Sequence, residues 1–276
     1  MKALVAIDLD GTLLNPDKEV SAANRQAIQA ALAAGVEIVI CTGRPLAAIE
    51  AILQKVGLDS ADHYSVTYNG GLVVANRGQE VLFEETLTME DLASIYPVLH
   101  DLGLPLEAVS RNRVYQLPYP TDYPGHYGDA RDFLPTEKVS LADLDGDLTF
   151  PKLVVATEPD HLDAQIPKLP QDFYQDYSLI HSVPEELEFM AQGIDKGKAL
   201  GILADRLGYS KDQVYAIGDE RNDAAMFAYA GTGIAMANSH PDILAQADLI
   251  TRSNSQDGVA YALREFILKK PGDLIQ

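Results

Sequence analysis

The chain has 276 residues and a mass of 30.0 kDa, which is enough for two domains, or for one domain with a large insertion, without support from disulfides. Its 41 acidic and 21 basic side chains give a formal charge of −20, so we expect no nucleic-acid partner and no binding to an anionic membrane surface. The single cysteine excludes an intrachain disulfide and fits a cytoplasmic location, and no apolar segment is long enough for a membrane span or a signal peptide.

The first part of the chain alternates apolar runs of strand length with helical patterns. It predicts strands over 2–9, 36–41 and 63–69 and helices over 22–34 and 46–56. Ser21 is suited to cap the first of these helices, and Gly35 is suited to end it. The sequence therefore begins with repeated strand-then-helix units.

The middle of the chain, from 81 to 190, has a different pattern and holds most of the prolines and tyrosines. It predicts helices over 88–102 and 159–168 among strand-like runs such as 113–117 and 149–157. The acidic run 143–147 follows no apolar strand, and we interpret it as a hairpin turn or loop. We predict that this region is a separate α+β unit.

The last part of the chain returns to the first pattern. It predicts helices over 196–207, 223–230, 241–246 and 258–268, and strands over 213–217, 232–236 and 248–251. Repeated units of this kind build a parallel sheet with helices on both faces. We therefore predict an α/β protein: a Rossmann-like, doubly wound core formed by 1–80 and 191–276, with an α+β domain over 81–190 inserted in it.

Acidic residues follow the first predicted strand directly, in the segment DLDGT over 8–12. Asp8 and Asp10 are two residues apart, so both project to the same side where the chain leaves the sheet, and ligands of open α/β sheets bind at that edge. Two adjacent carboxylates repel each other unless a cation or a shared proton separates them. A solvated turn is the alternative, but the apolar strand before the pair argues against it.

Three other polar segments adjoin predicted core strands. They are Thr42-Gly43-Arg44, Lys196 at the start of a helix, and the segment GDERND over 218–223, which contains Asp219, Asn222 and Asp223. Free backbone N–H groups beside a hydroxyl suit an anion, and clustered carboxylates suit a hard divalent cation. Together the segments predict a site for a phosphoryl group and Mg²⁺, although each of the three is weak alone.

The order and spacing of these four motifs resemble the haloacid dehalogenase superfamily of phosphotransferases. The similarity extends over essentially the whole chain and is greatest to the Cof-type phosphatases, which carry a large cap domain of the C2 type between their second and third motifs. The resemblance implies a Mg²⁺-dependent phosphatase that hydrolyses small phosphomonoesters, such as sugar phosphates, through an aspartyl-phosphate. The implied partner is a small phosphorylated metabolite, and no obligate protein partner is evident.

The resemblance also implies roles for individual residues. Asp8 would be the nucleophile and Asp10 the general acid and base. Thr42 would bind a phosphoryl oxygen, and Lys196, with Lys198 as a nearby competitor, would neutralise charge. The metal set would be Asp8, the backbone carbonyl of Asp10, Asp219 and Asp223, the last of these orienting metal-bound water or Lys196. The phosphate- or substrate-binding residues would be Thr12, Gly43, Arg44, Asn69, Gly70 and Asn222.

Some alternatives stay open at this point. Asn69-Gly70 matches the Asn-Gly that is usual in this branch, but it is also typical of a hairpin turn. A phosphomutase would use the same aspartyl-phosphate, and a non-catalytic sugar-phosphate sensor would bind without turnover, although a sensor has no use for an acid/base group such as Asp10. Candidates in the cap for recognising the leaving group are Arg111, Arg113, Tyr115 and Glu188.

Overall fold

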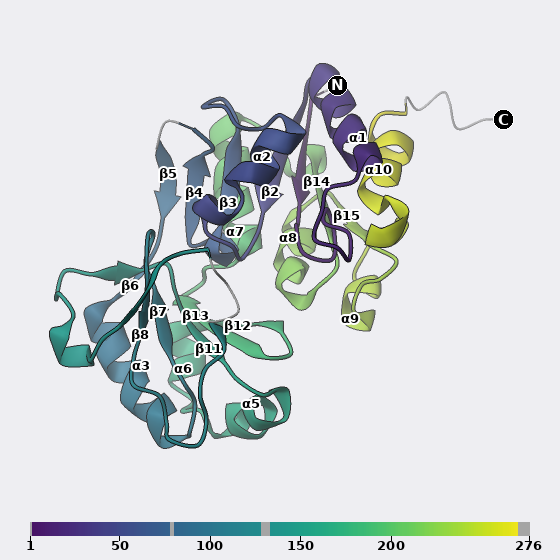
Figure 1. Ribbon diagram of the computed structural model, residues 1–276. Coiled ribbons are helices and arrows are strands. Elements are labelled where there is room, and N and C mark those ends of the chain that lie inside the picture. The colour runs from purple at the N-terminus through teal and green to yellow at the C-terminus, as the bar shows by residue number, and fades with distance from the viewer. Residues whose placement is uncertain (1, 78–79, 128–132, 270–276) are drawn as a thin grey trace. The chain divides into compact units, whose positions relative to one another are not determined.

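The computed structural model describes residues 2–77, 80–127 and 133–269. The chain divides into two compact units, of which the first joins Met1–Phe83 to Lys196–Gln276 and the second is Glu84–Asp195. Figure 1 shows both units. Within the described residues, no helix has the length and apolar character that crossing a membrane requires.

The first unit is built on an eight-stranded sheet, counted over the described residues, with the strand order β16-β15-β14-β1-β2-β3-β4-β5. Strands β16 to β3 run parallel, and β4 pairs antiparallel with β3. The strands are β1 (Ala3–Ile7), β2 (Val36–Cys41), β3 (Tyr64–Thr67), β4 (Leu72–Ala75), β5 (Val81–Glu84), β14 (Val214–Gly218), β15 (Thr232–Ala235) and β16 (Leu249–Ile250).

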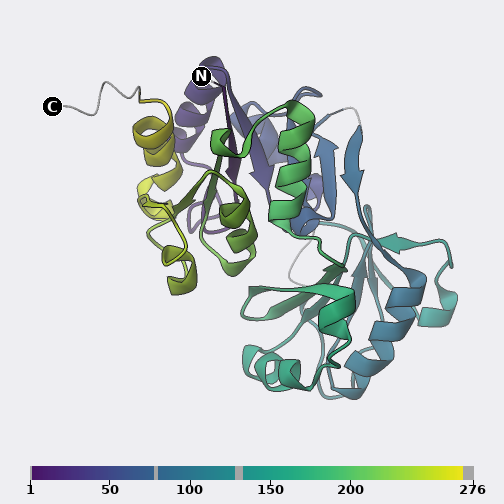
Figure 2. The ribbon, with the colours of Figure 1, turned by 180° about the vertical axis from the view of Figure 1, so that it is seen from behind.

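Helices cover both faces of this sheet because its central strands are apolar on both sides. On β1, Val5 and Ile7 pack into one core cluster, while Leu4 and Ala6 pack into the other. Residues of α1 (Ala22–Ala33), α2 (Glu50–Val56) and α10 (Gly258–Ala262) complete the first cluster, and residues of α7 (Lys196–Leu207), α8 (Ala224–Tyr229) and α9 (Pro241–Leu244) complete the second. Figures 1 and 2 view the sheet from opposite sides, with α2 in front in one and α7 in the other. The predicted α/β fold with a central parallel sheet is confirmed.

The second unit has its own core beneath a mainly antiparallel sheet with the order β12-β13-β11-β7-β8-β9. Its helices are α3 (Met89–Asp101), α5 (Pro159–Gln165) and α6 (Phe173–Asp176). Its strands are β6 (Leu87–Thr88), β7 (Glu107–Val109), β8 (Val114–Gln116), β9 (Thr136–Lys138), β10 (Thr149–Phe150), β11 (Lys152–Ala156), β12 (Tyr177–Val183) and β13 (Glu186–Ala191). The antiparallel strands make this an α+β unit.

Several predicted elements are shorter than expected. The run 149–157 is divided at Pro151 into β10 and β11, which belong to different sheets, because proline cannot donate a ladder hydrogen bond. The predicted helix 46–56 is a 3₁₀ turn followed by α2, and the helix 258–268 changes to a π turn after α10. The acidic run 143–147 lies in the connection between β9 and β10, so it is a loop and not a hairpin turn.

Candidate active site

The predicted motifs meet at one edge of the first unit's sheet. Asp8 follows the last residue of β1, Thr42 follows β2 and Asp219 follows β14, and β1 lies between β14 and β2. All three strands are parallel, so their carboxyl ends point to the same edge. Lys196 is the first residue of α7, which packs on this sheet.

Three carboxylates form a compact cluster at this edge. One oxygen each from Asp8, Asp219 and Asp223 lies within 4.8 Å of the others. All three side chains are buried, and that of Asp223 is fully so. The ammonium of Lys196, also fully buried, donates to Asp8 Oδ1 and to Asp223 Oδ1, each at 2.7 Å. Lys196 therefore bridges two of the three carboxylates.

The cluster carries more negative charge than its lysine neutralises. Burial, together with the charges of Asp223 and Asp219, raises the pKa of Asp8 well above its usual value despite Lys196. Burial and the charge of Asp223 likewise raise the pKa of Asp219 to about 7. For Lys196, burial disfavours the charged form, but Asp223 and Asp8 outweigh it and raise the pKa, so the ammonium stays charged.

This donor set fits a hard divalent cation. The carboxylate oxygens are hard ligands at a spacing that one ion can bridge, and the excess negative charge gives a cation a strong electrostatic attraction. No other group of three His, Cys, Asp or Glu side chains among the described residues has this geometry. The cluster is thus the candidate metal site.

The glycines and the threonine near the cluster explain how it is held. Thr12 Oγ1 donates to Asp219 Oδ1 at 2.6 Å, so this threonine orients a metal-site carboxylate. Gly11 has a φ of +82°, and a Cβ there would lie 2.1 Å from Asp219 Oδ2. A Cβ at Gly218 would lie 2.5 Å from an oxygen of Asp223. Only glycine lets the backbone approach these carboxylates so closely.

Asp10 is arranged differently from the other acids. Its carboxylate accepts hydrogen bonds from Arg44 Nε at 2.8 Å, from an Arg44 terminal nitrogen at 2.6 Å, and from Lys18 Nζ at 3.0 Å. Burial opposes ionisation of Asp10, but its bonds to Arg44 and Lys18 outweigh it and lower the pKa to about 2. The guanidinium of Arg44, which was predicted to bind phosphate or substrate, thus pairs with the predicted acid/base residue.

The turn after β3 is hydrogen-bonded to the loop after β2 and packs against it. The backbone N–H of Asn69 donates to the carbonyl of Thr42 at 3.0 Å, and a Cβ on Gly43 would lie 3.0 Å from the amide nitrogen of Asn69. Asn222 Nδ2 donates to Asn69 Oδ1 at 3.1 Å. Gly70 completes the turn, which connects β3 to the antiparallel β4, so Asn69-Gly70 occupies a hairpin connection beside the predicted phosphate loop.

The four candidates for leaving-group recognition all lie in the second unit, where each has a contact of its own. Arg111 pairs with Glu84 and Arg113 pairs with Glu137, both at exposed positions. Tyr115 meets Phe150 edge to face at a centroid distance of 6.3 Å. Glu188 is buried and accepts a 2.5 Å bond from Lys152 Nζ.

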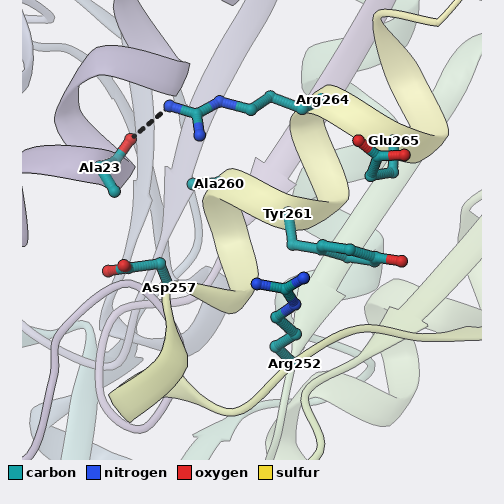
Figure 3. Close-up of a pocket in the computed structure, with 7 residues that line it drawn as sticks. All are labelled: Ala23, Arg252, Asp257, Ala260, Tyr261, Arg264 and Glu265. Atoms are coloured by element: carbon teal, nitrogen blue, oxygen red, sulfur yellow. Dashed lines mark hydrogen bonds between the residues drawn. The ribbon is translucent and has the colours of Figure 1, made fainter.

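A separate pocket lies beside α10, in the first unit, and contains none of the predicted site residues. Figure 3 shows the guanidinium of Arg252 next to the ring of Tyr261, 4.4 Å from its centroid, and Arg264 directed to the carbonyl of Ala23. Two arginines and two acids line it, so their formal charges cancel. Among the described residues, the group of three metal-ligating side chains lies elsewhere, at Asp8, Asp219 and Asp223.

Two residues near the motifs were not predicted. Lys18 reaches Asp10 because the chain after Asp10 folds back through short bridges of Leu14 with Asp10 and with Val20. Asn238 Nδ2 donates to the carbonyl of Gly11 at 2.9 Å. Neither has a local sequence signal, since the first depends on a loop and the second on a contact between distant segments.

Comparisons with known proteins support the family that the four motifs indicate. Residues 5–263 match the family model of haloacid dehalogenase-like hydrolases. The chain is 35% identical to "Putative phosphatase YxeH" of Bacillus subtilis over 98% of this chain and 100% of that one. It is 29% identical to the "5-amino-6-(5-phospho-D-ribitylamino)uracil phosphatase YcsE" of the same organism, over 96% of each chain.

A solved structure of a haloacid dehalogenase-like hydrolase has the same fold as this chain. A haloacid dehalogenase-like hydrolase from Bacteroides thetaiotaomicron matches with a TM-score of 0.81 and 27% identity, over 96% of this chain and 99% of that one. The match extends through both units, because it covers nearly the whole of each chain. The chain belongs to the haloacid dehalogenase-like hydrolases, as a phosphatase of their Cof-type branch.

Proposed function

We propose that the protein is a Mg²⁺-dependent phosphatase that hydrolyses small phosphomonoesters, with sugar phosphates as the main class, through an aspartyl-phosphate. The observation that carries the proposal is the buried ammonium of Lys196, held 2.7 Å from both Asp8 and Asp223 within the carboxylate cluster. The name of the relative YcsE describes a phosphatase of a phosphorylated ribityl compound, which supports the substrate class.

In the first step, an oxygen of Asp8 attacks phosphorus while the bond from phosphorus to the leaving alcohol breaks. Asp10 donates a proton to the alcohol oxygen, and the protonated alcohol leaves as the first product. Lys196 neutralises charge on the nucleophile and on the phosphoryl group. Because Asp10 is paired with Arg44 and ionised in this structure, it must separate from Arg44 and gain a proton before this step.

In the second step, water attacks the phosphorus of the aspartyl-phosphate, and Asp10 accepts a proton from that water. The bond to Asp8 breaks, inorganic phosphate leaves, and both carboxyl groups return to their initial state. The ionised form that Arg44 and Lys18 stabilise is the form able to accept this proton.

The metal would be held by Asp8, Asp219, Asp223 and the backbone carbonyl of Asp10, with Asp223 also orienting Lys196. When bound, Mg²⁺ supplies positive charge that offsets the charge of the phosphoryl oxygens. Thr12 orients Asp219 through the 2.6 Å hydrogen bond described above.

The phosphoryl oxygens would be bound by groups that follow β2 and β14. We assign this role to the Thr42 hydroxyl, to the backbone of Gly43 and to Asn222. Their support is the location of each at the carboxyl ends of parallel strands, next to the carboxylate cluster.

The inserted region 81–190 is proposed as the cap that selects the leaving group. Its support is that a compact unit with its own core, Glu84–Asp195, interrupts the first unit between β5 and α7. The proposed location is cytoplasmic, which agrees with a single, buried cysteine.

The test is phosphate release from a panel of phosphomonoesters that includes an aryl phosphate, measured with Mg²⁺ and with chelator. We expect phosphate release with Mg²⁺ and none with chelator. In Asp8→Asn, which removes the nucleophilic carboxylate but keeps nearly the same side-chain volume, the rate of release should fall on the order of 10⁴-fold or more. Isomerised sugar phosphate without free phosphate would instead identify a mutase. Saturable binding without any turnover would identify a sensor.

A further inference from the structure

The turn after β3 is strained at two consecutive residues. Tyr68 has a φ of +51° and Asn69 a φ of +53°, in the left-handed region that L-residues rarely adopt. Both side chains are buried, with exposed fractions of 1% and 0%. Such a conformation persists only where the surrounding structure holds it, and it is concentrated at functional sites.

The strained turn is fixed to the proposed phosphate loop by backbone hydrogen bonds. The N–H of Tyr68 donates to the carbonyl of Arg44 at 3.2 Å, and the N–H of Asn69 donates to the carbonyl of Thr42 at 3.0 Å. The amide of Asn69 also packs against Gly43, where a Cβ would come within 3.0 Å of it. These contacts place the Asn69 carboxamide directly beside this loop.

The Asn69 carboxamide holds a second asparagine in turn. Asn222 Nδ2 donates one hydrogen to Asn69 Oδ1 at 3.1 Å, and Asn222 Oδ1 is buried without a partner in the described structure. Among the described residues, the bond to Asn69 is thus the one hydrogen bond of the Asn222 side chain. An amide nitrogen carries two hydrogens, so the second remains for a phosphoryl oxygen.

We propose that Asn69 is a positioning residue, which acts on phosphate through Asn222 rather than by contact of its own. The inference rests on the proposed function, because it assigns a role at the same phosphate site. The left-handed turn sets the direction of the Asn69 side chain, Asn69 fixes the rotation of the Asn222 carboxamide, and Asn222 presents its free N–H to the phosphoryl group.

The variant Asn69→Gly separates this role from backbone strain. Glycine accepts a positive φ, so the turn is retained with the strain at position 69 relieved, while the carboxamide is lost. We expect thermal stability equal to or above that of the wild type. We also expect inorganic phosphate, with Mg²⁺ present, to bind about three- to tenfold more weakly, and KM for an aryl phosphate to rise by a similar factor, as for one lost hydrogen bond.

The double variant Asn69→Gly/Asn222→Ala tests whether Asn69 acts on phosphate through Asn222. Asn222→Ala alone should weaken phosphate binding, and adding Asn69→Gly to it should produce no further loss, because the residue on which Asn69 acts is already absent. If the double variant instead loses phosphate affinity by the product of the two single-variant factors, Asn69 contacts phosphate directly and the positioning role is overturned.

A matched control is Asp257→Gly, which relieves another positive φ, +56°, outside the proposed site. It should leave phosphate binding and KM unchanged. Unchanged phosphate binding in Asn69→Gly would overturn the inference while leaving the phosphatase intact. Phosphate binding by a wild-type protein that hydrolyses no phosphomonoester would reject the proposed function, and the binding measurements would still decide the role of Asn69.

Discussion

Arg44 holds the carboxylate of Asp10 with two hydrogen bonds, of 2.8 and 2.6 Å, and keeps that carboxylate ionised. This pairing keeps Asp10 in the form that accepts a proton, which the second step requires. Donation to the leaving group requires Asp10 to separate from Arg44. The two steps of the proposed reaction therefore place opposite demands on one ion pair.

Asp10→Asn should separate these two steps. With an aryl phosphate the leaving group needs no proton, so Asp8 can still be phosphorylated, whereas water is no longer activated. We expect a burst of about one equivalent of phenolate per enzyme, followed by steady-state turnover that is ~10²–10⁴-fold slower than in the wild type. Stopped-flow absorbance measures both phases. Slow turnover without a burst would show that Asp10 is not the base for the second step.

Lys196→Met should destabilise the protein because it leaves three buried carboxylates without their cation. We expect a loss of about 3–5 kcal/mol in the free energy of unfolding in chelator, measured by urea denaturation. Lys198→Met is the matched control, since Lys198 is two residues further along α7 and exposed, and it should cost at most about 1 kcal/mol. Equal losses in the two variants would contradict the central place given to Lys196.

Mg²⁺ should stabilise the folded protein through the carboxylate cluster. A ligand present at 100 times its dissociation constant adds about 2.7 kcal/mol to the free energy of unfolding. We expect Mg²⁺ to raise the melting temperature of the wild type and to raise it much less in Asp219→Asn. Asp212→Asn, at an exposed residue before β14, should respond like the wild type. A full Mg²⁺ shift in Asp219→Asn would place the ion elsewhere.

The sequence predicted those parts of the site that follow directly from buried strands. Asp8 and Asp219 come at the ends of apolar runs, and parallel strands bring their carboxyl ends together, so their meeting needs no knowledge of loops. The pairing of Asp10 with Arg44 was not predicted, because it depends on side-chain rotamers. Likewise Asn69 and Asn222 are 153 positions apart, and their contact has no local signal.

The same limit explains the strands that were not predicted in the second unit. β13 carries Glu186 and Glu188, and yet both are buried, at 4% and 1% exposure. Glu188 is stabilised there by Lys152, which comes from the neighbouring strand β11. A prediction based on apolar runs misses such a strand, because the burial of its acidic side chains depends on a partner that is distant in sequence.

The pair of His63 with Glu37, whose atoms Nδ1 and Oε1 lie 3.3 Å apart, should make the stability of the protein depend on pH. The bond to Glu37 raises the pKa of His63 although burial opposes it. A raised histidine pKa stabilises the fold fully below the unfolded value of about 6.5, and this stabilisation is lost as pH rises through the folded-state pKa. Glu37→Gln should therefore destabilise the protein more at about pH 5.5 than at about pH 8.5, measured by urea denaturation in chelator. Glu50→Gln, which removes the same charge from an exposed site on α2, should show no such difference, and equal effects of Glu37→Gln at both pH values would reject the pairing.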